Sequence, residues 1–310
     1  MITDLFTMNV LVGILASGFR LATPYLYATI GEAFGQRSGV LNLGLDGQML
    51  LGAFAAFYVA FNTGNLWLGL LAALIVGAVM GLAMAFVSVT LQAEQGISGI
   101  GFYLFGLGMS DLLFQQTLGS VETVKGFPPI NIPFLSEIPV LGRVLFSHNM
   151  MVYMAYLLVP VAWFVLNKTT FGLKVRAVGE NPGAADSLGV SVAKVRYITV
   201  TIGGALSGIA GASLSIALLN VFQQNLTSGL GFIAVALVYF GGWRPIGVLA
   251  GSLLFSMVNA LQLWVQVLGI DIPSEYAVMM PYVLTILVLV LAGQRVRPPA
   301  ALSKPFERGE

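Results

Sequence analysis

The stretch NKTTFGLKVRAVGENPGAADSLGVSVAKV, residues 167–195, is a polar segment between two long apolar runs. It holds four of the fourteen lysine and arginine residues of the chain. Short loops rich in lysine and arginine are typical of the cytoplasmic side of a membrane protein. We therefore expect residues 167–195 to form a cytoplasmic loop between two groups of membrane helices.

The rest of the chain is too apolar for a water-soluble protein. Hydrophobic residues make up 57% of the 310 residues, charged residues only 9%, and the mean hydropathy is +0.90. Long continuous apolar runs predict helices, because the strands of a membrane barrel alternate in polarity over about ten residues. The net charge of +1 argues against nucleic acid as a partner, and the absence of cysteine excludes disulfides and zinc–cysteine sites.

A membrane span needs about 20 apolar residues, and nine segments of the chain fit this pattern. They lie near 8–30, 40–60, 66–91, 97–118, 150–166, 197–220, 229–242, 246–268 and 276–293. The second begins with polar residues and the seventh is short, so either could be broken or re-entrant. The predicted fold is a single all-α integral membrane domain, residues 1–310, with about nine transmembrane helices.

The distribution of basic residues sets the predicted orientation. With 167–195 inside, eleven of the fourteen basic residues fall on the cytoplasmic side. The N-terminus is then outside, and the tail at 294–310 is cytoplasmic. Ser-Gly pairs open segments 38–53 and 228–242 at opposite faces, which suggests inverted-topology repeats, although such pairs also arise by chance.

The polar segment contains the signals of a short helix. Asn181 suits the N-cap, Pro182 the first helical position and Gly189 a left-handed stop, while Ser191 suits the cap of the next helix. We expect one or two helical turns parallel to the membrane, held by two polar loops, with a smooth surface of alanine and glycine facing a partner. An ordinary connecting helix explains the same residues.

The segment also resembles the cytoplasmic loop of ABC importer permeases in the branched-chain amino acid, ribose and nucleoside family. The matching positions are Gly172, Arg176, Ala177, Gly179, Asn181, Ala184, Ala185 and Gly189. Residues 39–53 and 229–251 resemble two further family segments, and Arg20 with Pro24 resembles the subgroup for nucleosides and simple sugars. Asp46 departs from the family pattern, because relatives usually carry glutamate there.

The resemblance implies a transport subunit that works with a separate ATPase. The chain lacks a Gly-x-x-x-x-Gly-Lys-Ser/Thr phosphate loop, so we expect no enzyme activity and no cofactor of its own, with ATP bound by the partner. Further implied partners are a homologous permease, as a heterodimer, and an external substrate-binding lipoprotein at a bacterial cytoplasmic membrane. The residues expected to couple to the ATPase are Arg176, Gly179, Glu180, Asn181, Pro182, Gly183, Ala184, Ala185 and Gly189. We expect Gly183→Trp or Ala185→Glu to abolish transport without preventing membrane insertion.

Polar residues at membrane depth are costly, and each suggests a function. The candidates for the translocation path are Arg20, Asn42, Asp46, Gln48, Asn259 and Gln262. In a functional interpretation, Asn42 and Asp46 share one helical face and meet a hydroxylated substrate. In the structural interpretation, which we favour for Asp46, it neutralises Arg20 or caps a broken helix. The amides suit a neutral sugar-and-base substrate, and they equally suit hydrogen bonds between helices.

The resulting functional prediction is a permease subunit of an ABC importer for nucleosides. A permease for simple sugars such as ribose, or for branched-chain amino acids, is the alternative within the family. An ion-coupled secondary transporter is the alternative from another class.

Overall fold

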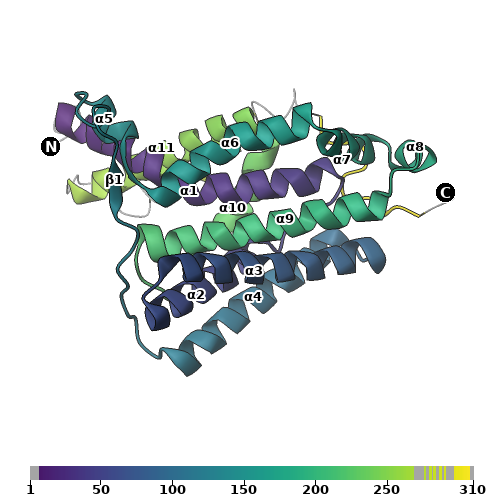
Figure 1. The fold of residues 1–310 in the computed structure, drawn as a ribbon, viewed down its shortest axis with the longest axis horizontal. Helices are drawn as coiled ribbons and strands as arrows, with labels where there is room; N and C mark the ends of the chain where they lie inside the picture. The colour runs from purple at the N-terminus through teal and green to yellow at the C-terminus, as the bar shows by residue number, and fades with distance from the viewer. Residues whose placement is uncertain are drawn as a thin grey trace.

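The computed structural model describes residues 7–268 and 297–307, together with single positions between 276 and 290. The described part is almost entirely helical, and its long helices run side by side (Figure 1). The long helices are α1 (Met8–Arg37), α2 (Leu45–Thr63), α3 (Leu66–Ala85), α4 (Gln95–Thr117), α6 (Met150–Lys168), α9 (Val192–Ser213) and α11 (Pro245–Val267). The predicted span at 276–293 lies mostly outside the described residues.

Six helices are long and apolar enough to cross a membrane, by length and composition, within the described ranges. They are Met8–Arg37, Leu66–Thr90, Gln95–Thr117, Met150–Lys168, Val192–Leu218 and Pro245–Val267. Two of them end in a π-helical turn, Phe86–Thr90 (η2) after α3 and Leu214–Leu218 (η3) after α9. The chain is therefore a multi-pass helical membrane protein, and the count of nine spans stays a prediction.

Helix α9 occupies the centre of the bundle. About 72% of the most apolar stretch of Val192–Leu218 is buried inside the protein, against 22–44% for the other five candidate spans. Helix α9 packs against α1, α2 and α3. Gly204 on α9 and Gly77 on α3 allow this closeness, because a Cβ at either position would lie 2.3 Å from the other glycine's carbonyl oxygen. Small residues at this contact therefore let the two helix backbones approach closely.

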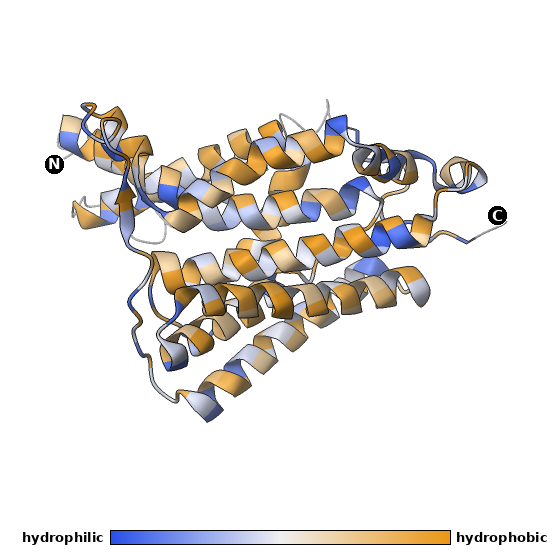
Figure 2. Ribbon diagram, viewed as in Figure 1, coloured by the Kyte–Doolittle hydropathy of each residue, from blue (hydrophilic) through white to orange (hydrophobic). Residues whose placement is uncertain are grey.

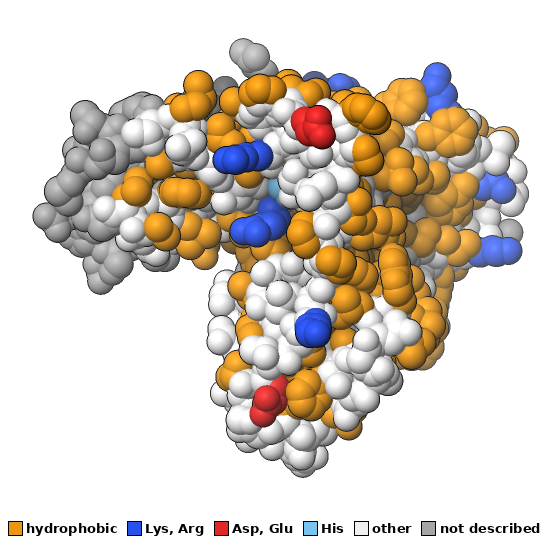
Figure 3. All heavy atoms as spheres, turned by 60° about the vertical axis from the view of Figure 1, so that its left-hand side comes forward, with side chains coloured by type: hydrophobic (Ala, Val, Ile, Leu, Met, Phe, Trp, Pro, Cys, Tyr) orange, Lys and Arg blue, Asp and Glu red, His pale blue; other side chains and the backbone are white. Residues whose placement is uncertain are grey.

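The two ends of the bundle differ. At one end, which we call the α5 end, lie the short helix α5 (Leu141–Leu145) and the antiparallel strands β1 (Pro129–Asn131) and β2 (Ser147–Asn149). At the opposite end, the α8 end, lie α7 (Thr170–Glu180) and α8 (Pro182–Ser187), and hydrophilic residues gather there in Figure 2. With the α5 end turned forward, the described surface shows a few scattered charged side chains among apolar and uncharged polar groups (Figure 3).

Both atypical spans begin later than the sequence patterns indicate. Residues 40–44 are not helical, and α2 begins at Leu45. The seventh predicted span contains only the 11-residue helix α10 (Leu230–Phe240). At about 1.5 Å per residue, α10 covers about 16 Å, roughly half of a hydrocarbon core of about 30 Å. Since α10 ends beside Trp243 at the α8 end, its N-terminus lies deep in the bundle.

Candidate translocation path and coupling surface

The N-terminal ends of α2 and α10 meet inside the bundle at Asp46. The backbone N–H of Gly231 donates to Oδ1 of Asp46 (2.7 Å), and the hydroxyl of Thr227 donates to Oδ2 (2.9 Å). The approach is close: a Cβ at Gly231 would lie 2.4 Å from Cα of Asp46. Asp46 itself is completely buried.

This geometry makes Asp46 the cap of α10. The N-cap residue of α10 is a glycine without a side chain, so a carboxylate from α2 satisfies the N–H group of Gly231. The positive end of the α10 dipole favours a negative charge at this position. Of the two structural alternatives, capping of a broken helix is the one observed. Arg20 is exposed on α1, and the partners of the Asp46 carboxylate are Thr227, Gly231 and the backbone of Gly229.

A buried polar network lies beside this junction, at the α8 end. Oε1 of Glu32 accepts hydrogen bonds from the side chain of Gln36 (2.9 Å) and from the backbone N–H of Asn42 (3.0 Å). Nδ2 of Asn42 donates to Oε1 of Gln48 (3.1 Å), and Gln36 accepts from the indole of Trp243 (2.7 Å). All five side chains are buried. The network joins α1, the 38–44 segment, α2 and the turn before α11.

The network corrects one prediction and adds a residue that the sequence analysis missed. Asn42 precedes α2, so it does not share a helical face with Asp46; its Oδ1 instead accepts from the N–H of Gly44. Glu32 was overlooked because its approximate span ended at residue 30, whereas α1 continues to Arg37. Nε2 of Gln48 is buried and has no hydrogen-bond partner in the described part of the chain.

The remaining path candidates lie elsewhere. Asn259 and Gln262 are half-buried on α11, and Asn259 hydrogen-bonds with Tyr25 of α1. Arg20 lies near His148 at the α5 end. Burial of the His148 imidazole is the main cause that lowers the pKa of His148, and the positive charge of Arg20 lowers it further. These three candidates are therefore not gathered with Asn42, Asp46 and Gln48, which come together at the α2–α10 junction.

The polar segment folds as two helices. The side chain of Asn181 accepts from the N–H of Ala184, Pro182 is at the first helical turn of α8, and Gly189 has φ +79°. Ser191 accepts from the N–H of Lys194 at the start of α9. These local contacts are the predicted ones. The loop predicted before Asn181 is instead the helix α7, whose N-terminus is capped by Thr169.

The exposed surface of this segment also differs from the prediction. Ala185 is only 3% exposed and packs in the hydrophobic core, whereas Ala184 is exposed. Leu188, just after α8, is 86% exposed. Ala185→Glu would therefore disrupt packing inside the chain and is not a clean test of coupling. Leu188 is the large apolar side chain that this segment exposes to solvent.

Two other motif residues have internal contacts. A Cβ at Gly179 would lie 2.0 Å from the carbonyl oxygen of Arg37, so this glycine allows α7 to rest on the end of α1. Arg176 is half-buried, and its Nε lies 3.4 Å from the carbonyl oxygen of Gly172. Gly179 therefore lets α7 pack against the end of α1, whereas the hydrogen bond of Arg176 stays within α7.

The C-terminal tail, predicted only as a cytoplasmic segment, lies across the α8 end and forms hydrogen bonds with several segments there. Ala301 is buried, and its N–H donates to the carbonyl oxygen of Gly179 (2.9 Å). Three further bonds join the tail to the bundle: Ser303 N–H to Gly39 O (3.1 Å), Arg196 Nη1 to Lys304 O (3.1 Å), and Gln92 Nε2 to Phe306 O (3.3 Å). The tail thus connects α7, the α1–α2 turn and the start of α9.

Comparisons with known proteins agree with this architecture. Residues 14–289 match the family described as branched-chain amino acid transport system / permease component. The guanosine ABC transporter permease protein NupQ of Bacillus subtilis is 38% identical, with 93% of this chain and 94% of that protein aligned. The nucleoside ABC transporter permease protein NupC of Lactococcus lactis is 36% identical over 94% and 96% of the two chains.

A further relative carries a different name. The putative glucose ABC transporter permease protein TsgC13 of Haloferax volcanii is 37% identical, with 97% of this chain and 99% of that protein aligned. No solved structure matches the chain. The family match covers most of the sequence, and the relatives align almost end to end. The chain therefore belongs to the family of branched-chain amino acid transport system permease components and is a membrane permease subunit of an ABC transporter.

Proposed function

We propose that this permease imports nucleosides and receives its driving force from a separate ATPase at the α8 end. The observation that carries the coupling proposal is Leu188, a large apolar side chain 86% exposed to water beside a short capped helix. Burying it in a cleft of a partner favours docking by about 2 kcal/mol. Because α7 and the tail connect α8 to α1 and α9, a displacement of α8 reaches the centre of the bundle.

The proposed orientation places the α8 end in the cytoplasm. Several basic residues lie at this end, and an excess of them is typical of the cytoplasmic side: Lys168 at the end of α6, Lys174 and Arg176 on α7, and Arg244 and Arg297 beside the same cavity as Arg176. The start of α1 is then outside, and the protein resides in a bacterial cytoplasmic membrane. The proposed partners are an ATPase, a homologous permease subunit and an external substrate-binding protein.

The proposed path passes the α2–α10 junction. Two helices begin there inside the bundle, and such discontinuous helices line solute sites in other transporters. The free Nε2 of Gln48 can donate to a solute hydroxyl, and Asn42 beside it offers amide chemistry without net charge. These groups suit a neutral polyhydroxyl solute better than a phosphate or a carboxylate.

Nucleosides are the proposed solutes because two close relatives are named as guanosine and nucleoside permeases. Simple sugars are the second candidate, since a relative of similar identity is named as a putative glucose permease. The test is uptake of radiolabelled guanosine by cells with and without this chain, in competition with glucose and ribose. Gene-dependent uptake that only nucleosides inhibit supports the proposal, and inhibition by glucose or ribose alone assigns the path to sugars.

The coupling surface has its own test in two substitutions at one position. Leu188→Glu places a charge where the ATPase cleft is apolar, so uptake should fall at least tenfold while membrane insertion is unchanged. Leu188→Met keeps an apolar side chain of similar size and should retain most uptake. Normal uptake with Leu188→Glu would remove Leu188 from the coupling surface.

A further inference from the structure

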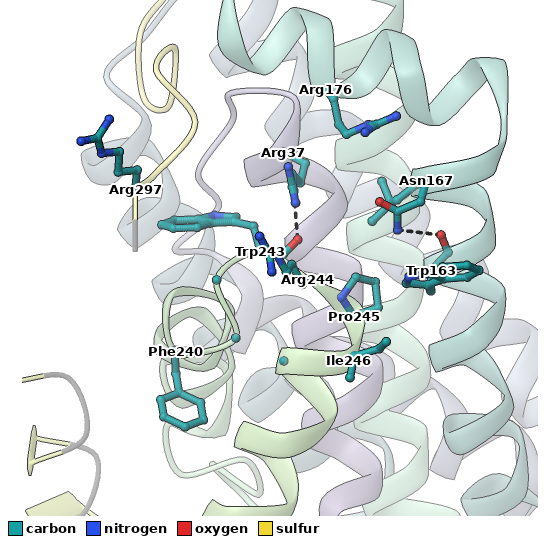
Figure 4. Close-up of a pocket in the computed structure, with 14 residues that line it drawn as sticks. Arg37, Trp163, Asn167, Arg176, Phe240, Trp243, Arg244, Pro245, Ile246 and Arg297 are labelled. Atoms are coloured by element: carbon teal, nitrogen blue, oxygen red, sulfur yellow. Dashed lines mark hydrogen bonds between the residues drawn. The ribbon is translucent and has the colours of Figure 1, made fainter. Parts of the chain in front are cut away.

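A cluster of four arginines lines one cavity at the α8 end. The cavity has a volume of about 1110 Å³, and Arg37, Arg176, Arg244 and Arg297 all line it. These arginines come from α1, α7, the residue before α11 and the C-terminal tail, as Figure 4 shows. None of the described lining residues is acidic. The charge of the lining residues therefore favours an anion in the cavity.

Internal contacts neutralise the charge of Arg37 only in part. The charges of Arg176 and Arg244 act unfavourably on that of Arg37, and Glu180 offsets only part of the repulsion. Arg37 uses Nε to donate to the carbonyl oxygen of Trp243 (2.9 Å), and this bond fixes the side chain beside the cavity. A counter-charge bound between these arginines would relieve this repulsion.

The N-terminus of α11 adds to the same field. Its N-cap residue, Arg244, makes no side-chain cap bond, and Pro245 stands at the first helical turn. Ile246 and Gly247 from that turn also line the cavity. The first turn of a long helix carries partial positive charge and backbone donors, which suit the oxygens of a phosphate.

The rim of the cavity indicates the source of the anion. Trp163 lines the cavity, and Nζ of Lys168 lies 5.8 Å from the centre of its ring. Tryptophan and lysine at a helix end are typical of the membrane–water interface, at the depth of the lipid headgroups. A cavity of this size also exceeds the needs of a lone phosphate ion and has room for a glycerophosphate headgroup.

We propose that this cavity binds the phosphate group of an anionic phospholipid headgroup. The inference goes beyond solute transport, and it rests on the proposed orientation only for the choice of the cytoplasmic leaflet. A bound headgroup would link α1, α7 and the start of α11 through one counter-ion, with Arg297 at the edge of the site (Figure 4). Anionic lipid would then support the attachment of the coupling helices.

The test is native mass spectrometry of the full-length chain, titrated with phosphatidylglycerol, phosphatidylcholine or inorganic phosphate. The variant is Arg244→Gln with Arg297→Gln, since both side chains are exposed and neither has a hydrogen bond to a described residue. Lys174→Gln, also exposed but outside the cavity, is the control that removes a charge from α7. Each arginine near a membrane surface contributes about fivefold in affinity for anionic lipid, so the double variant should bind phosphatidylglycerol about 25-fold more weakly.

Preferential binding of phosphatidylglycerol that the double variant loses and the control retains supports the proposal. If inorganic phosphate binds through these arginines and phosphatidylglycerol is not preferred, the cavity is a site for a free anion and the lipid assignment is overturned. Equal lipid and phosphate binding by wild type and double variant, with unchanged thermal unfolding, overturns the proposal. The proposal is also overturned if the double variant no longer co-purifies with the ATPase while its lipid affinity is unchanged. The cavity would then bind an acidic part of the ATPase.

Discussion

Replacement of Asp46 gives a graded test of the α2–α10 junction. Asp46→Ala removes both hydrogen bonds and leaves the N–H of Gly231 and the hydroxyl of Thr227 buried without their acceptor. Hydrogen bonds to a charged group contribute about 1.5–3 kcal/mol each, so loss of both should lower the free energy of unfolding by about 3–6 kcal/mol. Asp46→Asn keeps an acceptor for Gly231 and a partner for Thr227, and it loses mainly the interaction of the charge with the α10 dipole, up to about 2 kcal/mol.

The assay is unfolding of the purified chain by SDS titration, followed by tryptophan fluorescence, with uptake measured in parallel. Thr227→Ser is the matched control, because it retains the hydroxyl and should stay within about 0.5 kcal/mol of wild type. The predicted order of stability is wild type and Thr227→Ser first, then Asp46→Asn, then Asp46→Ala. A stable Asp46→Ala variant that has lost uptake would refute the capping argument and assign Asp46 to the solute.

Three further predictions concern packing, the tail and pH. Gly204→Val should lower the free energy of unfolding by about 3 kcal/mol or more, because its Cβ would lie 2.3 Å from a backbone carbonyl oxygen of α3. Gly101→Val is the control, since the space around Gly101 is open, and it should lower the free energy of unfolding far less in the same SDS titration. Ala301→Asp should detach the tail from Gly179, since it buries a charge beside that contact; limited proteolysis should then cut the tail faster, with the helical bundle intact by circular dichroism. Burial lowers the pKa of His148 in the folded protein, so its contribution to stability is complete above the unfolded pKa of about 6.5 and decreases as the pH falls below that value. The protein should therefore unfold at a lower temperature at pH 5.5 than at pH 7.5. His148→Gln should reduce the difference between the two unfolding temperatures.

The sequence predicted those features that depend on local chemistry. Asn181, Pro182 and Gly189 form the expected cap, first turn and stop, because each is determined by backbone geometry within a few residues. The atypical starts of the second and seventh spans were also visible as polar or short segments. The helix α7 was missed, although Thr169 three residues before Gly172 is an N-cap signal that could have been used.

Features that depend on distant parts of the chain were not accessible in the same way. Basic residues could be assigned to one side of the membrane, yet nothing in the sequence brings Arg37, Arg176, Arg244 and Arg297 into one cavity. Burial of Ala185 depends on the packing of α8 in the hydrophobic core, and alanine suits both a surface and a core. The attachment of the tail depends on backbone hydrogen bonds, which leave no side-chain signature.

The most direct measurement is guanosine uptake into proteoliposomes that contain this permease with its partner subunits, with and without ATP on the α8 side. Substrate-binding protein is supplied on the other side. We predict uptake that requires ATP, persists when ion gradients are abolished, and is lost with Leu188→Glu but kept with Leu188→Met. Uptake that follows an ion gradient without ATP, or that is unaffected by Leu188→Glu, would contradict the account.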